Sequence, residues 1–269
     1  MDKKTQVAPM TASGSIATVP RGRRTPMDRA SRPRRIVDQP DTAPTTSQAE
    51  EFEPNPRSEF LCRLLNVAVA LLLTALSAPI MLLTAILVRL TSNGPILYTQ
   101  TRVGLDRRWN RTQALRERRR EDLGGTPFTI YKFRSMRVDA EANGQAVWAS
   151  VDDDRVTAIG RMMRRTRIDE LPQLFNVLAG DMNIVGPRPE RPSIFVRLRE
   201  QIDEYPVRQR VKPGITGLAQ VSHPYDSCIE DVRKKVSFDI EYMRRQSLMA
   251  DFAIMLRTFP VMVLRIGGR

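Results

Sequence analysis

An unbroken apolar run constrains this chain more than any other feature. Residues 64–88 contain no charged side chain, and Arg63 and Arg89 flank them. At ~1.5 Å per residue, a straight helix of that length exceeds a hydrocarbon core of ~30 Å. No polar stripe of the kind that marks a buried core helix interrupts the run. The sequence therefore predicts a membrane segment here.

The path of this segment depends on Ser77, Pro79 and the charges at its two ends. Proline removes a backbone donor and clashes with the preceding turn, so we expect a bend at Ser77 to Pro79. Arginines lie on both flanks, and a full crossing would export one of these sides against the positive-inside tendency. The residues alone leave two paths equally open: a crossing helix, or one that enters, breaks and returns.

The segment before the apolar run has a different composition. Eight of the chain's 19 prolines fall within the first 58 of its 269 residues, among clustered arginines. Such a segment cannot bury enough apolar surface to offset the entropy of ordering, so we predict that residues 1–58 are a disordered, basic, proline-rich arm. It lacks the apolar stretch and cleavage site of a secretory signal.

Charge and rare residues narrow the chemistry. The formal net charge is +13, which favours phosphate-bearing partners such as anionic lipid or nucleic acid. Two cysteines, Cys62 and Cys228, exclude a disulfide framework and a cysteine-based zinc module. A single histidine, His223, makes a Ser-His-Asp triad improbable. Any catalysis must rest on carboxylates assisted by Arg or Lys.

The remainder alternates short strands and helices, which predicts one mixed α+β, α-rich domain. We expect strands at residues 96–100 and 128–133, separated by a polar insert at 107–125. Helices are expected at 155–167, around 171–178 with Gly180 as the cap, and at 229–247. Residues 248–266 fit an interfacial membrane helix and a core-packing helix equally well.

Adjacent carboxylates mark the candidate site. Pro172 is tolerated only in a first helical turn, so we expect a helix that starts near Ile168 with Asp169 and Glu170 at its N-terminus. Unpaired N–H groups there, with Arg164 nearby, favour ionised carboxylates. Such a carboxylate is a candidate nucleophile for phosphoryl transfer, and its neighbour a candidate Mg²⁺ ligand. Capping is the structural alternative.

Cations elsewhere support this interpretation. Lys132 and Arg134 follow a predicted strand, and Arg188 is held between two prolines, which suits bidentate phosphate contacts. Each alone is more often a surface ion pair. The sequence has no glycine-rich phosphate loop of the kinase or Rossmann type.

Six collinear strings together resemble the bacterial sugar transferases, the monotopic polyprenyl-phosphate phosphoglycosyl transferases, and the resemblance covers residues 58–266. The strings are Asn93-Gly94-Pro95 with Gln100-Thr101-Arg102-Val103-Gly104; Tyr131-Lys132-Phe133-Arg134-Ser135-Met136; Asp169-Glu170-Leu171-Pro172-Gln173-Leu174-Phe175-Asn176-Val177; Gly180-Asp181-Met182; Val185-Gly186-Pro187-Arg188-Pro189; and Lys212-Pro213-Gly214-Ile215-Thr216-Gly217-Leu218-Ala219-Gln220-Val221.

The resemblance implies a membrane-bound enzyme. It implies a re-entrant helix at residues 59–91 broken at Ser77 and Pro79, then a small cytoplasmic α/β catalytic domain at 92–269 with an interfacial C-terminal helix. The expected location is the cytoplasmic face of the inner membrane. The expected reaction moves a sugar-1-phosphate from a UDP-sugar to undecaprenyl phosphate with Mg²⁺ and starts exopolysaccharide or related glycan assembly. It implies no nucleic acid partner and admits a homodimer.

The resemblance also implies residue roles. Asp169 would attack the β-phosphate, expel UMP and carry a covalent sugar-phosphate, and Glu170 would bind Mg²⁺. The remaining motif positions that line the site are Lys132, Arg134, Arg164, Asp181 and Arg188. After Val221 the chain departs from the family pattern in a segment that we connect with sugar choice, so no donor sugar is predicted. The alternative function is a non-catalytic, membrane-anchored basic adaptor that binds anionic lipid or nucleic acid.

Overall fold

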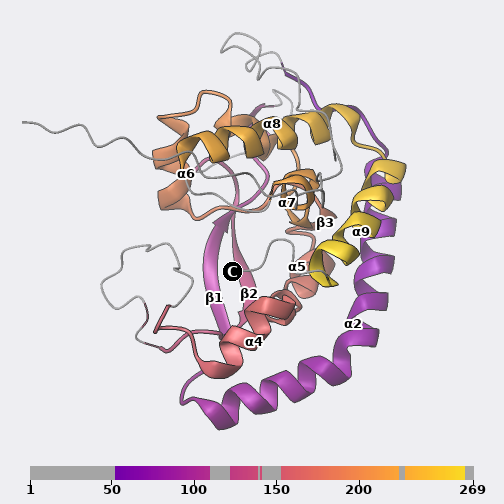
Figure 1. The fold of residues 1–269 in the computed structure, drawn as a ribbon. Helices are drawn as coiled ribbons and strands as arrows, with labels where there is room; N and C mark the ends of the chain where they lie inside the picture. The colour runs from indigo at the N-terminus through magenta and orange to yellow at the C-terminus, as the bar shows by residue number, and fades with distance from the viewer. Residues whose placement is uncertain (1–51, 110–121, 139, 141–152, 224–227, 264–269) are drawn as a thin grey trace, which may run out of the picture. The chain divides into compact units, whose positions relative to one another are not determined.

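The computed structural model describes residues 52–109, 122–138, 140, 153–223 and 228–263 (Figure 1). The chain divides into units at residues 1–38 and 39–269, and every described residue belongs to the second. Most of the predicted arm, residues 110–121 of the insert, and residues 224–227 after the last family motif lie outside the described residues.

The described unit mixes helices with short strands, as the sequence predicts. In chain order its elements are α2 (Glu59–Thr91), β1 (Leu97–Val103), η1 (Arg107–Trp109), β2 (Pro127–Phe133), α4 (Ala158–Thr166), η2 (Ile168–Glu170), α5 (Gln173–Ala179), β3 (Asn183–Val185), α6 (Pro192–Arg199), η3 (Tyr205–Arg210), β4 (Gly214–Thr216), α7 (Leu218–Ser222), α8 (Ile229–Arg245) and α9 (Leu248–Val263).

Two small sheets organise the unit. β1 and β2 pair antiparallel with Leu97 opposite Phe133 and Val103 opposite Pro127, which confirms both strand predictions and makes the insert the hairpin's connection. β3 and β4 pair in parallel through Asn183 with Gly214. The main core lies between these sheets and the helices, and its largest fully buried side chains include Tyr205 and Phe195.

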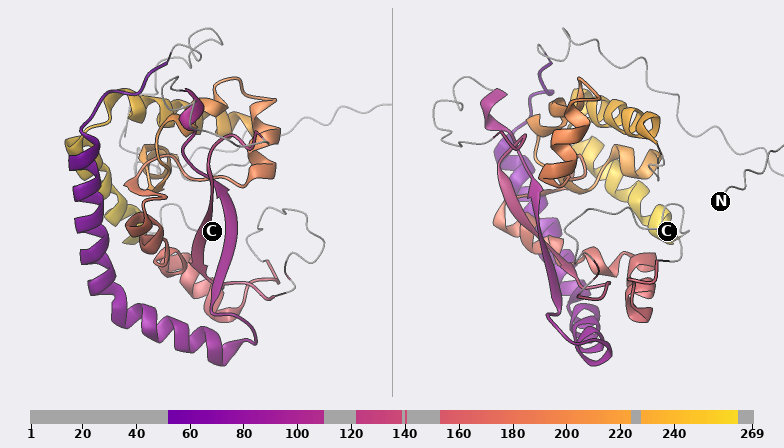
Figure 2. Two further views of the ribbon diagram at one scale, coloured as in Figure 1. Left: turned by 180° about the vertical axis from the view of Figure 1, so that it is seen from behind. Right: turned by 90° about the vertical axis from the view of Figure 1, so that its left-hand side faces the viewer.

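Helix α2 runs along one side of this unit and bends near its middle (Figures 1 and 2). The helix contains Pro79, which leaves the carbonyl four residues earlier without its usual donor. The Ser77 hydroxyl donates a 2.6 Å hydrogen bond to the Leu73 carbonyl. The structure confirms the predicted bend, with helical residues on both sides of it.

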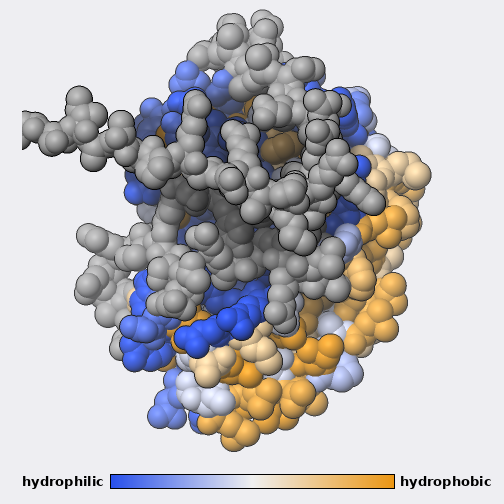
Figure 3. All heavy atoms as spheres, in the orientation of Figure 1, coloured by the Kyte–Doolittle hydropathy of each residue, from blue (hydrophilic) through white to orange (hydrophobic). Residues whose placement is uncertain are grey.

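Apolar side chains cover α2 and the neighbouring helix α9 on their outer faces (Figure 3). Only 17% of the most apolar window of α2 is buried, so the segment is not a core helix. On α9, Ile254 is buried while Met249 and Phe259 are more than 70% exposed. Helix α9 therefore packs one face against the core and leaves the other face exposed. It combines features of the core-packing helix and of the interfacial helix that the sequence left open. Apolar surface of this extent indicates membrane association.

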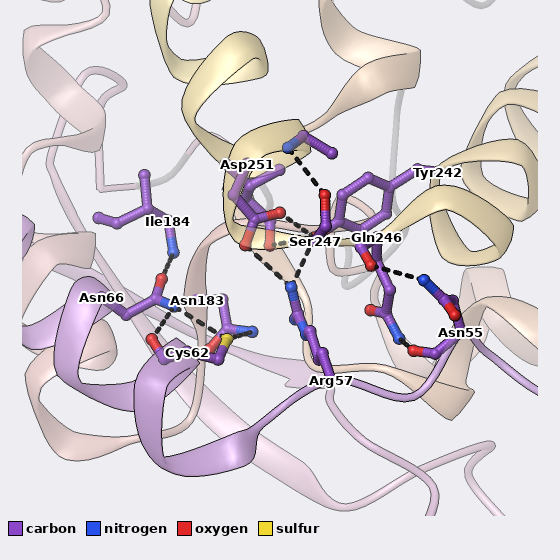
Figure 4. A network of polar contacts seen from close by, with 12 residues as sticks. Asn55, Arg57, Cys62, Asn66, Asn183, Ile184, Tyr242, Gln246, Ser247 and Asp251 are labelled. Atoms are coloured by element: carbon purple, nitrogen blue, oxygen red, sulfur yellow. Dashed lines mark hydrogen bonds and ion pairs between the residues drawn. The ribbon is translucent and has the colours of Figure 1, made fainter.

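A buried polar network ties the start of α2 to α8 and α9 (Figure 4). Arg57 lies 2.9 Å from an Asp251 carboxylate oxygen, and the Tyr242 hydroxyl donates to the other oxygen at 2.7 Å. Further along α2, Asn66 accepts a hydrogen bond from the Ile184 amide of β3. Arg63 donates to the last carbonyls of α5, at Val177 and Leu178. The first half of α2 is thereby fixed to the elements that carry the site.

We expect Arg57→Met to destabilise the fold by about 3 kcal/mol, because the substitution strands a carboxylate, Asp251, that is only 3% exposed. Thermal unfolding in detergent measures the change. The matched control is Arg245→Met, whose side chain is 79% exposed and pairs with Glu241 along its helix; it should cost less than about 0.5 kcal/mol. Equal effects of the two substitutions would contradict a structural role for the network.

Candidate active site

A sharp turn between α4 and α5 positions the two carboxylates. Arg167 adopts the left-handed conformation with φ of 58°, ends α4 and starts the 3-10 turn η2. A helical turn begins at Ile168, where the sequence predicts a helix start, but it is a 3-10 turn, and the α-helix begins only at Gln173. Pro172 has no N–H to continue the ladder, and the Leu171 amide bonds the Ile168 carbonyl instead. Asp169 and Glu170 thus lie in a buried turn before the helix.

Glu170 lies at the centre of a cluster of cations. Its Oε1 atom is 2.8 Å from Lys132 Nζ of β2 and 2.6 Å from Arg188 Nη2 of the loop after β3, with Arg167 Nη1 at 3.8 Å. Burial would raise the pKa of Glu170, but Arg188 and Lys132 outweigh it and hold the pKa well below its ordinary value. Glu170 is therefore ionised, as the sequence predicts.

The pKa of Asp169 is shifted in the opposite direction. It is 7% exposed, and its Oδ1 atom is buried with no hydrogen-bond partner within the described part of the chain. Burial, and secondly the negative charge of Glu170, raise the pKa of Asp169 to about 6. The expectation that its surroundings favour ionisation is wrong in direction, because the turn supplies no donor to this oxygen. The carboxylate is still mostly ionised at neutral pH.

The structure brings Lys132, Asp169, Glu170 and Arg188 together, and the other three predicted site residues make other contacts. Arg134 is 5% exposed and donates to the Ser92 and Asn93 carbonyls, so it closes the end of α2. Arg164 lies on α4 and acts electrostatically on Asp153. Asp181 accepts a long, 3.4 Å hydrogen bond from Asn176. Substrate contacts by these three residues stay predictions.

Two supporting residues escaped the sequence analysis. Asn176 is fully buried on α5; its Oδ1 accepts from the Tyr131 amide and its Nδ2 donates to the Thr129 carbonyl, which fixes α5 to the strand of Lys132. Arg208 donates to the Arg188 carbonyl at 3.1 Å. A buried amide among the apolar residues of the helix, shared only with Gln173 within α5, was the available signal for Asn176. Nothing in the sequence distinguishes Arg208 from the other arginines.

The carboxylate pair fits a Mg²⁺ ion that is shared with a substrate. Each of the three cations contacts Glu170 at Oε1. Among the described residues, no group of three or more His, Cys, Asp or Glu side chains could hold a metal. Mg²⁺ commonly binds one or two carboxylates and completes its shell with phosphate oxygens and water. Glu170 could therefore hold it only together with a phosphate-bearing ligand.

The raised pKa of Asp169 predicts a pH-dependent stability. Because the folded pKa of about 6 exceeds the ordinary 3.8, folding disfavours the ionised form, so stability falls as pH rises through 6. The side chain of Asp169→Asn cannot ionise. Its free energy of unfolding, relative to that of the wild type, should therefore rise by on the order of 2 kcal/mol between about pH 4 and pH 8. Thermal unfolding across this range measures the difference. The exposed control Asp154→Asn should show no such gain, and a gain that shrinks with pH would contradict the assignment.

Comparison with known proteins places the chain in a family. A family model described as bacterial sugar transferase matches residues 57–265. The UDP-N-acetylgalactosamine-undecaprenyl-phosphate N-acetylgalactosaminephosphotransferase of Aeromonas hydrophila is 38% identical over 223 residues, which are 83% of this chain and 48% of that protein. The UDP-glucose:undecaprenyl-phosphate glucose-1-phosphate transferase of Caulobacter vibrioides is 42% identical over 200 residues, 74% of this chain and 68% of that protein.

A third relative, the UDP-glucose:undecaprenyl-phosphate glucose-1-phosphate transferase of Escherichia coli strain K12, is 37% identical over 75% of this chain and 40% of its own length. The chain thus spans about half or less of the Aeromonas and Escherichia relatives, and about two thirds of the Caulobacter one. The family match contains both carboxylates, Lys132 and Arg188. The chain belongs to the bacterial sugar transferase family.

Proposed function

We propose that this protein transfers a sugar-1-phosphate from a UDP-sugar to undecaprenyl phosphate, through a covalent intermediate on Asp169. The names of the relatives supply the two substrates. The observation that carries the mechanism is the buried Asp169 oxygen that has no donor among the described residues, next to a Glu170 held ionised by two cations. A carboxylate that no donor stabilises keeps its lone pairs available for attack.

In the first step an Asp169 oxygen bonds to the β-phosphorus of the UDP-sugar. The bond from this phosphorus to the bridging oxygen breaks, and UMP leaves with the electron pair. The product is a mixed anhydride of carboxylate and sugar phosphate. Lys132 and Arg188 both contact Glu170, so their positive charges lie close together. These charges offset the repulsion between the attacking anion and the diphosphate.

In the second step a phosphate oxygen of undecaprenyl phosphate attacks the same phosphorus. The bond to Asp169 breaks, the free carboxylate is restored, and a lipid diphospho-sugar forms. One buried residue thus acts first as nucleophile and then as leaving group. A pKa near 6 suits both roles, since the carboxylate is ionised at neutral pH yet departs readily.

Mg²⁺ bound by Glu170 and the diphosphate would neutralise charge that develops on the leaving UMP. The chain's own residues orient the reacting groups: Lys132 from β2 and Arg188 from the loop after β3 converge on the turn that carries Asp169.

The membrane geometry supports a reaction between a soluble and a lipid substrate. The bend in α2 and the exposed apolar faces of α2 and α9 fit a helix that enters and leaves the bilayer on the cytoplasmic face of the inner membrane. Arg63 and Asn66 fix this helix to α5 and β3, so the carboxylates stay at a set distance from the lipid surface.

The alternative of a non-catalytic basic adaptor gains no support from the site. Its central cations, Lys132 and Arg188, are engaged by a buried carboxylate, whereas an adaptor would hold them ready for an external polyanion.

Detergent-purified protein incubated with Mg²⁺ and a UDP-sugar should release UMP and gain the mass of one sugar-phosphate on the peptide that contains Asp169. Asp169→Asn should lose both signals, with transfer to undecaprenyl phosphate reduced by about 10³-fold or more. Intact-mass and peptide mass spectrometry measure the adduct. The exposed control Asp154→Asn should behave like the wild type. Unchanged turnover in Asp169→Asn would exclude the carboxylate nucleophile.

A further inference from the structure

A cavity of about 140 Å³ is lined by Arg188, the residue whose guanidinium contacts Glu170. Three parts of the chain form the walls that matter here. The loop after β3 contributes Arg188 and Glu190, η3 contributes Tyr205 and Arg208, and α8 contributes Lys235 and Asp239. The mechanism above uses only the first of these residues.

The floor of this cavity is fixed before any ligand arrives. Arg208 Nε and Asp239 Oδ2 are 2.6 Å apart, and both side chains are less than 10% exposed. The same guanidinium lies 4.9 Å from the centre of the Tyr205 ring and donates to the Arg188 carbonyl. A buried, fully hydrogen-bonded ion pair of this kind holds a preorganised shape.

Arg188 makes the cavity part of the reaction centre. Its Nη2 atom is 2.6 Å from Glu170, while the residue also lines the cavity. A ligand whose phosphate is attacked by Asp169 would therefore place its next covalent neighbour at the cavity. For a UDP-sugar, the two neighbours of the attacked phosphorus are the pyranose and the UMP group.

The lining favours the pyranose. Arg208 pairs with Asp239, Arg188 with Glu170, and Glu190 faces Arg102 at 3.8 Å, so carboxylates already engage both guanidinium groups of the lining, and Lys235 is its third cation. Tyr205 is 1% exposed, so the one aromatic side chain in the described lining has no free face on which uracil could stack. Carboxylates and an ammonium group beside short apolar side chains match ring hydroxyls and a sugar face.

We infer that this cavity binds the pyranose ring of the donor, and that Glu190 and Lys235 select among sugars by hydrogen bonds to ring substituents. The inference rests on the proposed function. Sites that bond a hydroxyl reject analogues that lack it or misplace it far more strongly than apolar pockets do. Lys235 is half-buried on the α8 face that lines the cavity, whereas its neighbour Lys234 is exposed and does not line it.

The test compares Lys235→Ala with the matched control Lys234→Ala, and adds Glu190→Gln as a second cavity variant. UMP release is measured with UDP-glucose, UDP-galactose and UDP-N-acetylgalactosamine, and inhibition by UMP is measured in parallel. We expect the ratio of kcat/KM between the best and second-best donor to change by at least about tenfold in both cavity variants. Inhibition by UMP and the thermal midpoint should stay within twofold and a few degrees of the wild type.

Two results would overturn the inference: unchanged donor ratios in both cavity variants, or a tenfold weakening of UMP inhibition with unchanged ratios, which would assign the cavity to the nucleotide. Failure of the proposed function looks different, because the wild type would then release no UMP from any donor. In that event, the binding of glucose 1-phosphate, measured by saturation-transfer NMR, still tests whether the cavity binds a sugar. Binding that is lost in Lys235→Ala and kept in Lys234→Ala supports the sugar cavity, and equal binding in both contradicts it.

Discussion

The contact of Glu170 with Lys132 and Arg188 is the interaction on which the rest of this site depends. It joins a strand, a 3-10 turn and a proline-bounded loop that are far apart in the sequence. A buried carboxylate without these cations would be costly, and the cations without it would repel each other. The same contact that closes the fold therefore concentrates positive charge next to Asp169. The same three side chains therefore stabilise the fold and form the site.

The environment separates two neighbouring carboxylates into two roles. The same cations act on both carboxylates: for Glu170 they outweigh burial and lower the pKa, whereas for Asp169 burial and the negative charge of Glu170 outweigh them and raise it. Such a divergence of pKa values is how proteins assign different tasks to identical groups. The left-handed Arg167 makes the divergence possible, because the turn that it starts directs two consecutive side chains into different surroundings.

Local patterns in the sequence predict the elements well. The structure contains the helix predicted from the uncharged run and the bend predicted from Pro79. It also contains the two predicted strands and the helix end predicted at Gly180. Lys132, Glu170 and Arg188 could be nominated from the sequence because strand ends, helix starts and rigid loops commonly carry ligand contacts. The hydrogen bonds of Arg134 could not be predicted, because they depend on the end of α2 lying beside this residue in the fold. The raised pKa of Asp169 could not be predicted either, because it depends on how the fold buries this side chain and on which groups lie beside it.

The pH dependence of the first half-reaction tests the central claim most directly. Rapid-quench measurement of UMP release in the wild type should show a rate that rises with pH and levels off above a midpoint near 6. In Glu170→Gln the rate will be lower, but the midpoint should move down, because the negative charge that raises the pKa of Asp169 is gone while Lys132 and Arg188 remain. A midpoint that stays in place or moves up in Glu170→Gln would contradict the account.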